Sequence, residues 1–143
     1  MTSTTTAAAQ HGTTGTHQTT ARRRPPATAV VAIGLTVLAA VVGGYGACYF
    51  TGLDGWTPIS ETFVVTYLAF SVFGLAVVGS MVFGSGSLRS AARYGLATYG
   101  VWMIGFTAFK LVRFSEYQAI PFGIVGLAIL VLSLSRPTRS WAT

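Results

Sequence analysis

The chain contains 143 residues, of which 52% are hydrophobic and 8% are charged. Soluble domains carry about 25% charged residues, so this composition excludes an ordinary soluble fold and predicts an all-α membrane protein. Nine Lys and Arg residues stand against three Asp and Glu, yet no basic cluster lies on a polar, foldable segment, so we expect no nucleic-acid partner. A lone cysteine, Cys48, excludes CxxC redox pairs and cysteine-rich zinc sites.

The first segment, residues 1–26, is rich in threonine and has no apolar periodicity. We expect it to form a disordered cytoplasmic tail. His11 and His17 stand six residues apart without another ligand type between them, so we interpret them as surface histidines and not as a metal site. Three arginines at positions 22–24 and two prolines close the tail, a pattern typical of a cytoplasmic anchor before a membrane helix.

Residues 27–50 carry no charge and predict the first membrane-spanning helix. At 1.5 Å per residue this run is about 36 Å long, enough to cross a hydrocarbon core of about 30 Å with some tilt. A secretory signal peptide is the competing interpretation, but its apolar region would be shorter. Ala39, Gly43 and Ala47 repeat at four-residue spacing. Small residues at this spacing allow close approach of a second helix, so we expect this face to pack against a neighbour.

The second helix is expected over residues 58–83. Thr57 precedes a proline, the combination of an N-cap with proline in the first helical position. Glu61 then falls in the first turn, close to the positive end of the helix dipole. The following residues are uncharged to the end of the segment and are long enough to span a bilayer. Tyr67 and Phe70 fit lipid-facing positions as well as packed ones.

The third helix is expected over residues 88–113. At helical spacing, one stripe of this helix contains Tyr99, Met103, Phe106, Lys110 and Arg113. The two cations at its end are either anchors that extend to the membrane surface or partners of a nearby acidic residue. A spacing of five separates three glycines, Gly95, Gly100 and Gly105. Because this spacing does not keep them on one face, we interpret them as separate points of close helix approach.

The fourth helix is expected over residues 117–135, which at about 28 Å just reaches across a bilayer. Ser115 and Gln118 fit the capping-box pattern at its start. Pro121 falls near the beginning of this segment and would either kink the helix or delay its regular start. We place the end of the transmembrane domain, residues 27–139, after Arg139, and expect residues 140–143 to form a cytoplasmic end.

Four such helices predict an up-down bundle with both termini on one side of the membrane. That side would carry seven Lys and Arg residues and no acid, whereas the other would carry two cations and all three acids. Basic residues in short loops favour the cytoplasmic side. The sequence therefore predicts a multi-pass protein of the bacterial plasma (inner) membrane with a cytoplasmic N-terminus and C-terminus.

The charged residues of the opposite side form the single candidate polar site: Asp54, Glu61, Lys110, Arg113 and Glu116. Opposite charges near the membrane surface stabilise each other and an unpaired charge is costly, so Glu61 with Lys110 is the first expected ion pair. The site is either a structural set of ion pairs or a binding site for a polar ligand or a lipid head group. Two cations among three acids argue against a metal ion, and we expect no cofactor.

Several function classes are excluded by missing residues. Residues 27–50 hold no acidic side chain, which excludes proton exchange of the kind used by small multidrug exporters. No expected span contains histidine, which excludes intramembrane proteases that depend on it. We therefore expect no enzyme. The first hypothesis is an accessory or scaffold subunit that packs with itself or with a larger membrane protein in the lipid bilayer. The alternative is a small permease or ligand-binding module that uses Glu61, Lys110 and Arg113.

Overall fold

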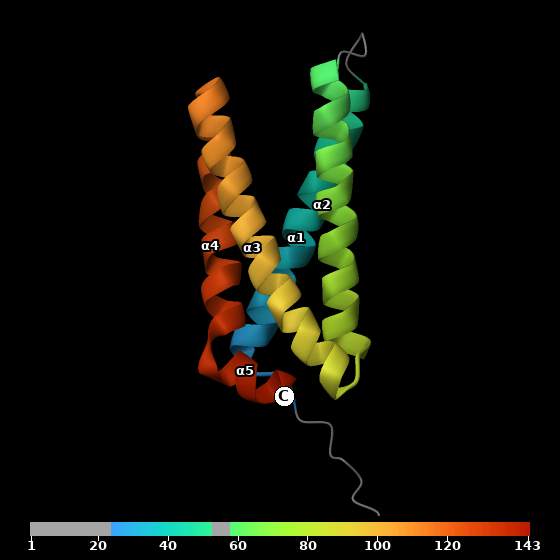
Figure 1. Cartoon of the computed structure of the whole chain (residues 1–143), viewed down its shortest axis with the longest axis vertical. Coiled ribbons are helices and arrows are strands. Elements are labelled where there is room, and N and C mark those ends of the chain that lie inside the picture. Colours follow the sequence, from blue (N-terminus) through green and yellow to red (C-terminus); the bar gives the residue numbers. More distant parts are fainter. Residues whose placement is uncertain (1–23, 53–57) are drawn as a thin grey trace, which may run out of the picture.

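The computed structural model of the chain describes residues 24–52 and 58–143 (Figure 1). Within these ranges the chain is almost entirely helical. Its elements are α1 (Ala27–Thr51), α2 (Pro58–Phe83), α3 (Gly86–Phe114), the short 3-10 helix η1 (Tyr117–Ala119), α4 (Ile120–Leu134) and α5 (Arg136–Ala142). Residues 1–23 of the Thr-rich tail, the expected Thr57 cap and Asp54 lie outside the described residues.

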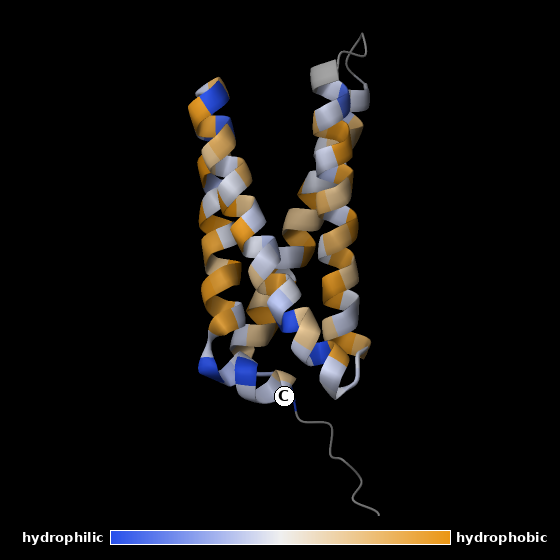
Figure 2. Ribbon diagram, viewed as in Figure 1, coloured by the Kyte–Doolittle hydropathy of each residue, from blue (hydrophilic) through white to orange (hydrophobic). Residues whose placement is uncertain are grey.

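Four helices are long and apolar enough to cross a membrane, which confirms the four spans expected from the sequence. They are Ala27–Tyr49, Ser60–Phe83, Gly86–Phe114 and Tyr117–Leu134. The most apolar windows of these spans have mean hydropathies of 2.2, 2.0, 1.3 and 2.0, so the third span is the most polar of the four. Figure 2 shows the hydrophilic residues toward the two ends of the molecule, with largely apolar helices between them.

The long helices are arranged as two pairs, α1 with α2 and α3 with α4. Figure 1 shows that consecutive long helices run in opposite directions and that α3 starts beside the end of α2 and slants away from it toward α4. The two pairs then diverge toward the other end of the molecule. Large side chains fill this diverging region, where the Phe106 ring meets the rings of Tyr67 at 5.6 Å and Phe63 at 6.4 Å.

Glycines bring α3 and α4 into backbone contact. A Cβ atom added at Gly100 would lie 2.6 Å from the carbonyl oxygen of Gly126, and one at Gly126 would lie 2.7 Å from the Cβ of Met103. On the α2 side, a Cβ at Gly95 would lie 2.9 Å from a methyl group of Val77. Close approach is therefore confirmed at Gly95 and Gly100. Gly105 has no neighbour within 4 Å of such an atom, so the interpretation of this third glycine was wrong.

The connection from α3 to α4 differs from the expected capping box. Ser115 ends α3 in the left-handed conformation, with φ of 54°, and its N–H donates to the carbonyl oxygen of Leu111. The 3-10 helix η1 follows, without a side-chain cap. Helix α4 then begins at Ile120 with Pro121 in its first turn, where proline is tolerated because its missing N–H would have no helical partner. Pro121 therefore delays the start of the helix.

Helix α5 was not expected from the sequence, which treated residues 140–143 as an end. Ser135 is extended and Pro137 starts a new helix. The hydroxyl groups of Thr138 and Thr28 share a hydrogen bond of 2.9 Å, and Ala142 is 1% exposed. The last residues thus fold back against the start of α1 and α3. Seven residues carry too little periodicity to predict such a helix.

Candidate functional site

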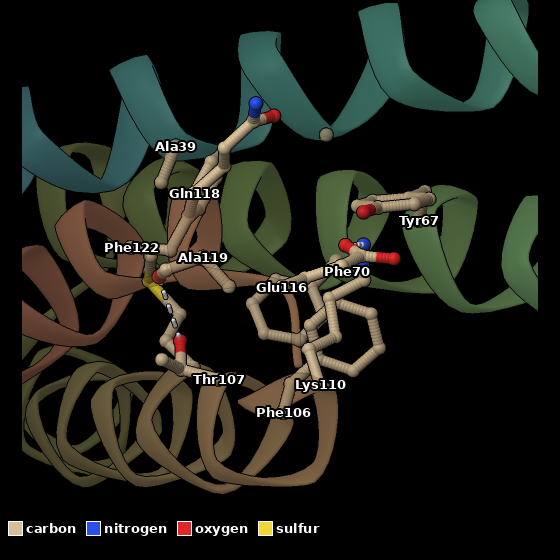
Figure 3. Close-up of a pocket in the computed structure, with 12 residues that line it drawn as sticks. Ala39, Tyr67, Phe70, Phe106, Thr107, Lys110, Glu116, Gln118, Ala119 and Phe122 are labelled. Carbon is tan, nitrogen blue, oxygen red and sulfur yellow. Dashed lines mark hydrogen bonds and ion pairs between the residues drawn. The ribbon is translucent and has the colours of Figure 1, made fainter. Parts of the chain in front are cut away.

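A pocket of about 190 Å³ lies between the two helix pairs on the diverging side of the molecule (Figure 3). Its walls come from α1, α2, α3, the segment that joins α3 to α4, and the first turn of α4. The lining residues are Ala39, Gly43, Tyr67, Phe70, Met103, Phe106, Thr107, Lys110, Glu116, Gln118, Ala119 and Phe122. Most of these side chains are apolar or aromatic, so the pocket suits a ligand with an apolar body.

Lys110 provides the positive charge of the pocket. It is 8% exposed, and its Nζ donates to Glu116 Oε2 at 2.7 Å. Three aromatic rings surround the ammonium group, with Nζ at 5.2 Å from the ring centre of Phe63, 5.7 Å from Phe106 and 5.8 Å from Tyr67. We call these three rings the Lys110 cage. A cation at these distances is attracted by the negative ring faces, so the cage and the carboxylate together stabilise the buried charge.

The ion pair is a consequence of how α3 ends. The left-handed Ser115 reverses the chain, so Glu116 turns back toward Lys110, which lies six residues earlier. The structure therefore pairs Lys110 with Glu116 and not with Glu61, which lies exposed in the first turn of α2. Arg113 is also exposed. Of the five residues in the expected polar site, the structure brings Lys110 and Glu116 together, and Asp54 lies outside the described residues.

Further polar groups lie along the same wall. Thr107 Oγ1 donates to the carbonyl oxygen of Ala119 at 3.4 Å, which ties η1 to α3. Gln118 lies on η1 and is exposed. Figure 3 shows Gln118 and Glu116 reaching into the pocket region from the connection between α3 and α4. Polar groups therefore gather at this connection, whereas the α1 wall consists of Ala39 and Gly43.

Gly43 of α1 faces α2 within the same chain, and the small residues on either side of it are buried. Ala39 and Ala47 are 6% and 2% exposed. A Cβ atom at Gly43 would lie 3.0 Å from Ser71 Oγ on α2, and this hydroxyl donates to the carbonyl oxygen of Ala40 at 2.7 Å. The close α1–α2 approach thus uses Gly43 and Ala40. The lack of a side chain at Gly43 also leaves room for the pocket beside it.

Several pocket residues were missed from the sequence. The stripe of α3 did contain Met103, Phe106 and Lys110, so its helical spacing was an adequate signal for that wall. Phe70 was assigned equally to lipid, but it is 7% exposed and its ring packs edge-on against Tyr99 at 4.9 Å. No pattern in the sequence showed that Tyr67 would turn toward Lys110, since α2 is apolar on every side.

The fold and pocket define a class of protein, namely a small helical protein with four membrane-length helices and a mostly apolar pocket between its two helix pairs. Within the described ranges, no three His, Cys, Asp or Glu side chains come together in a way that could hold a metal ion. Comparisons with family models, curated proteins and solved structures found no match to the chain.

Proposed function

We propose that the chain is a small, non-enzymatic membrane protein that binds an apolar molecule with a polar head in the pocket beside Lys110. The observation that carries this proposal is the combination of an apolar, aromatic pocket of about 190 Å³ with one ion pair at its wall. Binding sites for small molecules are largely apolar cavities with a few placed polar groups. The apolar body would lie against Phe70, Met103 and Phe122, and the head would meet Lys110.

The ion pair suits a polar head because its two members differ in exposure. The Lys110 side chain is 10% exposed and held within its cage, whereas the Glu116 side chain is 45% exposed. A ligand acceptor group could therefore replace Glu116 on the ammonium group at small cost, since the displaced carboxylate would regain water. Lys110 would donate to the head, and Glu116 would act as its exchangeable partner.

The membrane setting and orientation belong to the same proposal. Arg89, Arg93, Arg136 and Arg139 belong to the end that carries α5, and the sequence adds three arginines before α1. The positive-inside rule favours this end in the cytoplasm, with both termini there and the pocket toward the outside. We propose the bacterial plasma membrane as the location, with the lipid bilayer as the surrounding partner.

The accessory-subunit hypothesis has weaker support. Its expected contact face consists of Ala39, Gly43 and Ala47. Within this chain Ala39 and Ala47 are already buried and Gly43 packs against α2. A second copy or a larger membrane protein would have to bind elsewhere on the chain. The pocket, in contrast, needs no additional chain to be complete.

The proposal is tested by analysing the small molecules that co-purify with the full-length protein in mild detergent. Ala39→Phe would place a ring in the pocket, and Val41→Phe is the matched control because Val41 is 60% exposed on the outer face of α1. We expect a molecule that is retained by the wild type and by Val41→Phe and is lost from Ala39→Phe. Lys110→Met should weaken its retention without filling the pocket. Equal small-molecule content in all four proteins would refute the proposal.

A further inference from the structure

Arg93 is a buried cation that has no anionic partner among the residues that the structure describes. It lies in the first turns of α3 and is 5% exposed. Within residues 24–52 and 58–143, its Nε is buried and has no hydrogen-bond partner, and the ion pair present there joins Lys110 to Glu116. The Tyr94 ring lies 4.5 Å from the guanidinium carbon and covers one face of the group, but it accepts no hydrogen bond in the guanidinium plane.

Arg89, four residues earlier, is stabilised differently. Its Nε donates to the carbonyl oxygen of Met81 at 3.3 Å and its Nη2 to that of Gly84 at 3.1 Å. The ring of Trp141 on α5 lies 4.6 Å from its guanidinium carbon. Arg89 therefore closes the α2–α3 connection and holds α5 in place. Arg93 lies one turn later on the same helix face, but it neither donates to the α2–α3 connection nor packs on the Trp141 ring.

No described acidic side chain is placed to neutralise Arg93. Glu61 is in the first turn of α2 and Glu116 follows the end of α3, and both positions lie at the end of the molecule opposite to the start of α3 (Figure 1). The charged side chains of α5 are Arg136 and Arg139. Cations therefore dominate the end that holds Arg93, and a buried cation without a counter-charge is costly. An anion from outside the chain would remove that cost.

We infer that Arg93 binds the phosphate of an anionic phospholipid head group. Arg93 is the eighth residue of α3, about 10 Å from the start of the helix at 1.5 Å per residue, a depth at which a long side chain reaches the head-group layer. Guanidinium matches phosphate geometry through paired N–H donors. Basic sites between helices on the cytoplasmic side recognise such head groups.

This site rests on the membrane setting of the proposed function and is independent of the pocket ligand. Native mass spectrometry of the full-length protein in detergent, incubated with phosphatidylglycerol or phosphatidylcholine, tests it. Arg93→Gln removes the charge, and Arg139→Gln is the matched control because Arg139 is exposed. We expect wild type and Arg139→Gln to retain phosphatidylglycerol over phosphatidylcholine. Arg93→Gln should retain phosphatidylglycerol about tenfold less, as expected for a lost charged hydrogen bond.

Equal loss in the two variants, or equal retention of the two lipids by the wild type, would overturn the inference. If Arg93→Gln does not fold, Arg93→Lys replaces it, because it keeps the charge but not the paired donors, and it should still retain less phosphatidylglycerol than Arg139→Gln. Inorganic phosphate is the second probe. Displacement of the lipid by phosphate at equal concentration would assign the site to free phosphate and overturn the lipid source. Ala39→Phe should leave lipid retention unchanged, so failure of the pocket proposal is seen separately.

Discussion

The coupling between Lys110 and Glu116 gives the sharpest test of the structure, because the sequence favoured Glu61 as the partner. At 2.7 Å the Coulomb attraction is about 6 kcal/mol at an effective dielectric of about 20 and about 1.5 kcal/mol in water. The Glu116 side chain is 45% exposed, so solvent screens the pair and side-chain ordering costs part of the gain. We therefore expect a coupling free energy of about 1–2 kcal/mol.

The two single substitutions should differ in cost. Glu116→Gln leaves the Lys110 ammonium group without its carboxylate partner. Cation–π attraction in the Lys110 cage offsets only part of the lost stabilisation, so we expect the variant to be destabilised by about 2 kcal/mol. Lys110→Met leaves a half-exposed carboxylate and places a thioether among aromatic rings, which suits methionine. Its cost should be about 1 kcal/mol or less. The double variant should be less destabilised than the sum of the two.

Reversible unfolding in mixed micelles of sodium dodecyl sulfate and a mild detergent, followed by circular dichroism, measures these free energies. Glu61→Gln combined with Lys110→Met is the control cycle, because Glu61 is exposed and forms no ion pair within the described residues. Its coupling should be close to zero. A larger coupling for Glu61 than for Glu116 would refute the arrangement at the end of α3 and restore the pairing expected from the sequence.

Three further predictions concern packing and orientation. Gly100→Ala should destabilise the protein by about 1–3 kcal/mol, because the added methyl group would meet the α4 backbone. Gly105→Ala has open space around it and should be neutral or stabilising by up to about 1 kcal/mol. Thermal unfolding in detergent compares the stabilities of the two variants. Ser71→Ala should lower the unfolding free energy by about 0.5–1.5 kcal/mol, because the hydrogen bond to the carbonyl oxygen of Ala40 is lost. Ser80→Ala should cost less, because the Ser80 hydroxyl donates within its own helix. Equal costs in the same assay would contradict the α1–α2 contact. A fluorescent protein fused after Thr143 should fluoresce and an alkaline phosphatase fused there should be inactive, and the reverse result would invert the proposed orientation.

Much of the fold was predictable because a membrane-length helix can be recognised from the residues of its own segment. The long uncharged runs of α1 and α2 lie within one or two residues of the expected bounds, since length and apolarity are properties of a single segment. Pro121 predicted either a kink or a delayed helix start, and the structure has the delayed start. Helix α5 was not predicted because it is stabilised by contacts with α1 and α3, such as the hydrogen bond between the Thr138 and Thr28 hydroxyl groups.

The candidate site was predictable only in part. Lys110 stood out as the single lysine of the chain, on a stripe with Met103 and Phe106, and all three line the pocket. Its partner was misjudged because the turn at Ser115 depends on a left-handed residue that the capping-box pattern concealed. Arg93 was read as one more cytoplasmic charge, and nothing in its sequence context separated it from Arg89.

The sequence by itself determined that the chain forms four membrane-length helices and that its basic residues gather toward one end, because hydrophobicity and charge are carried by each segment alone. The tertiary structure decided which faces meet. Helices that are apolar on every side carry no amphipathic stripe to orient them, so the rotation of α2 toward Lys110, the splay of the two pairs and the burial of Arg93 depend on side chains from several helices packing at once.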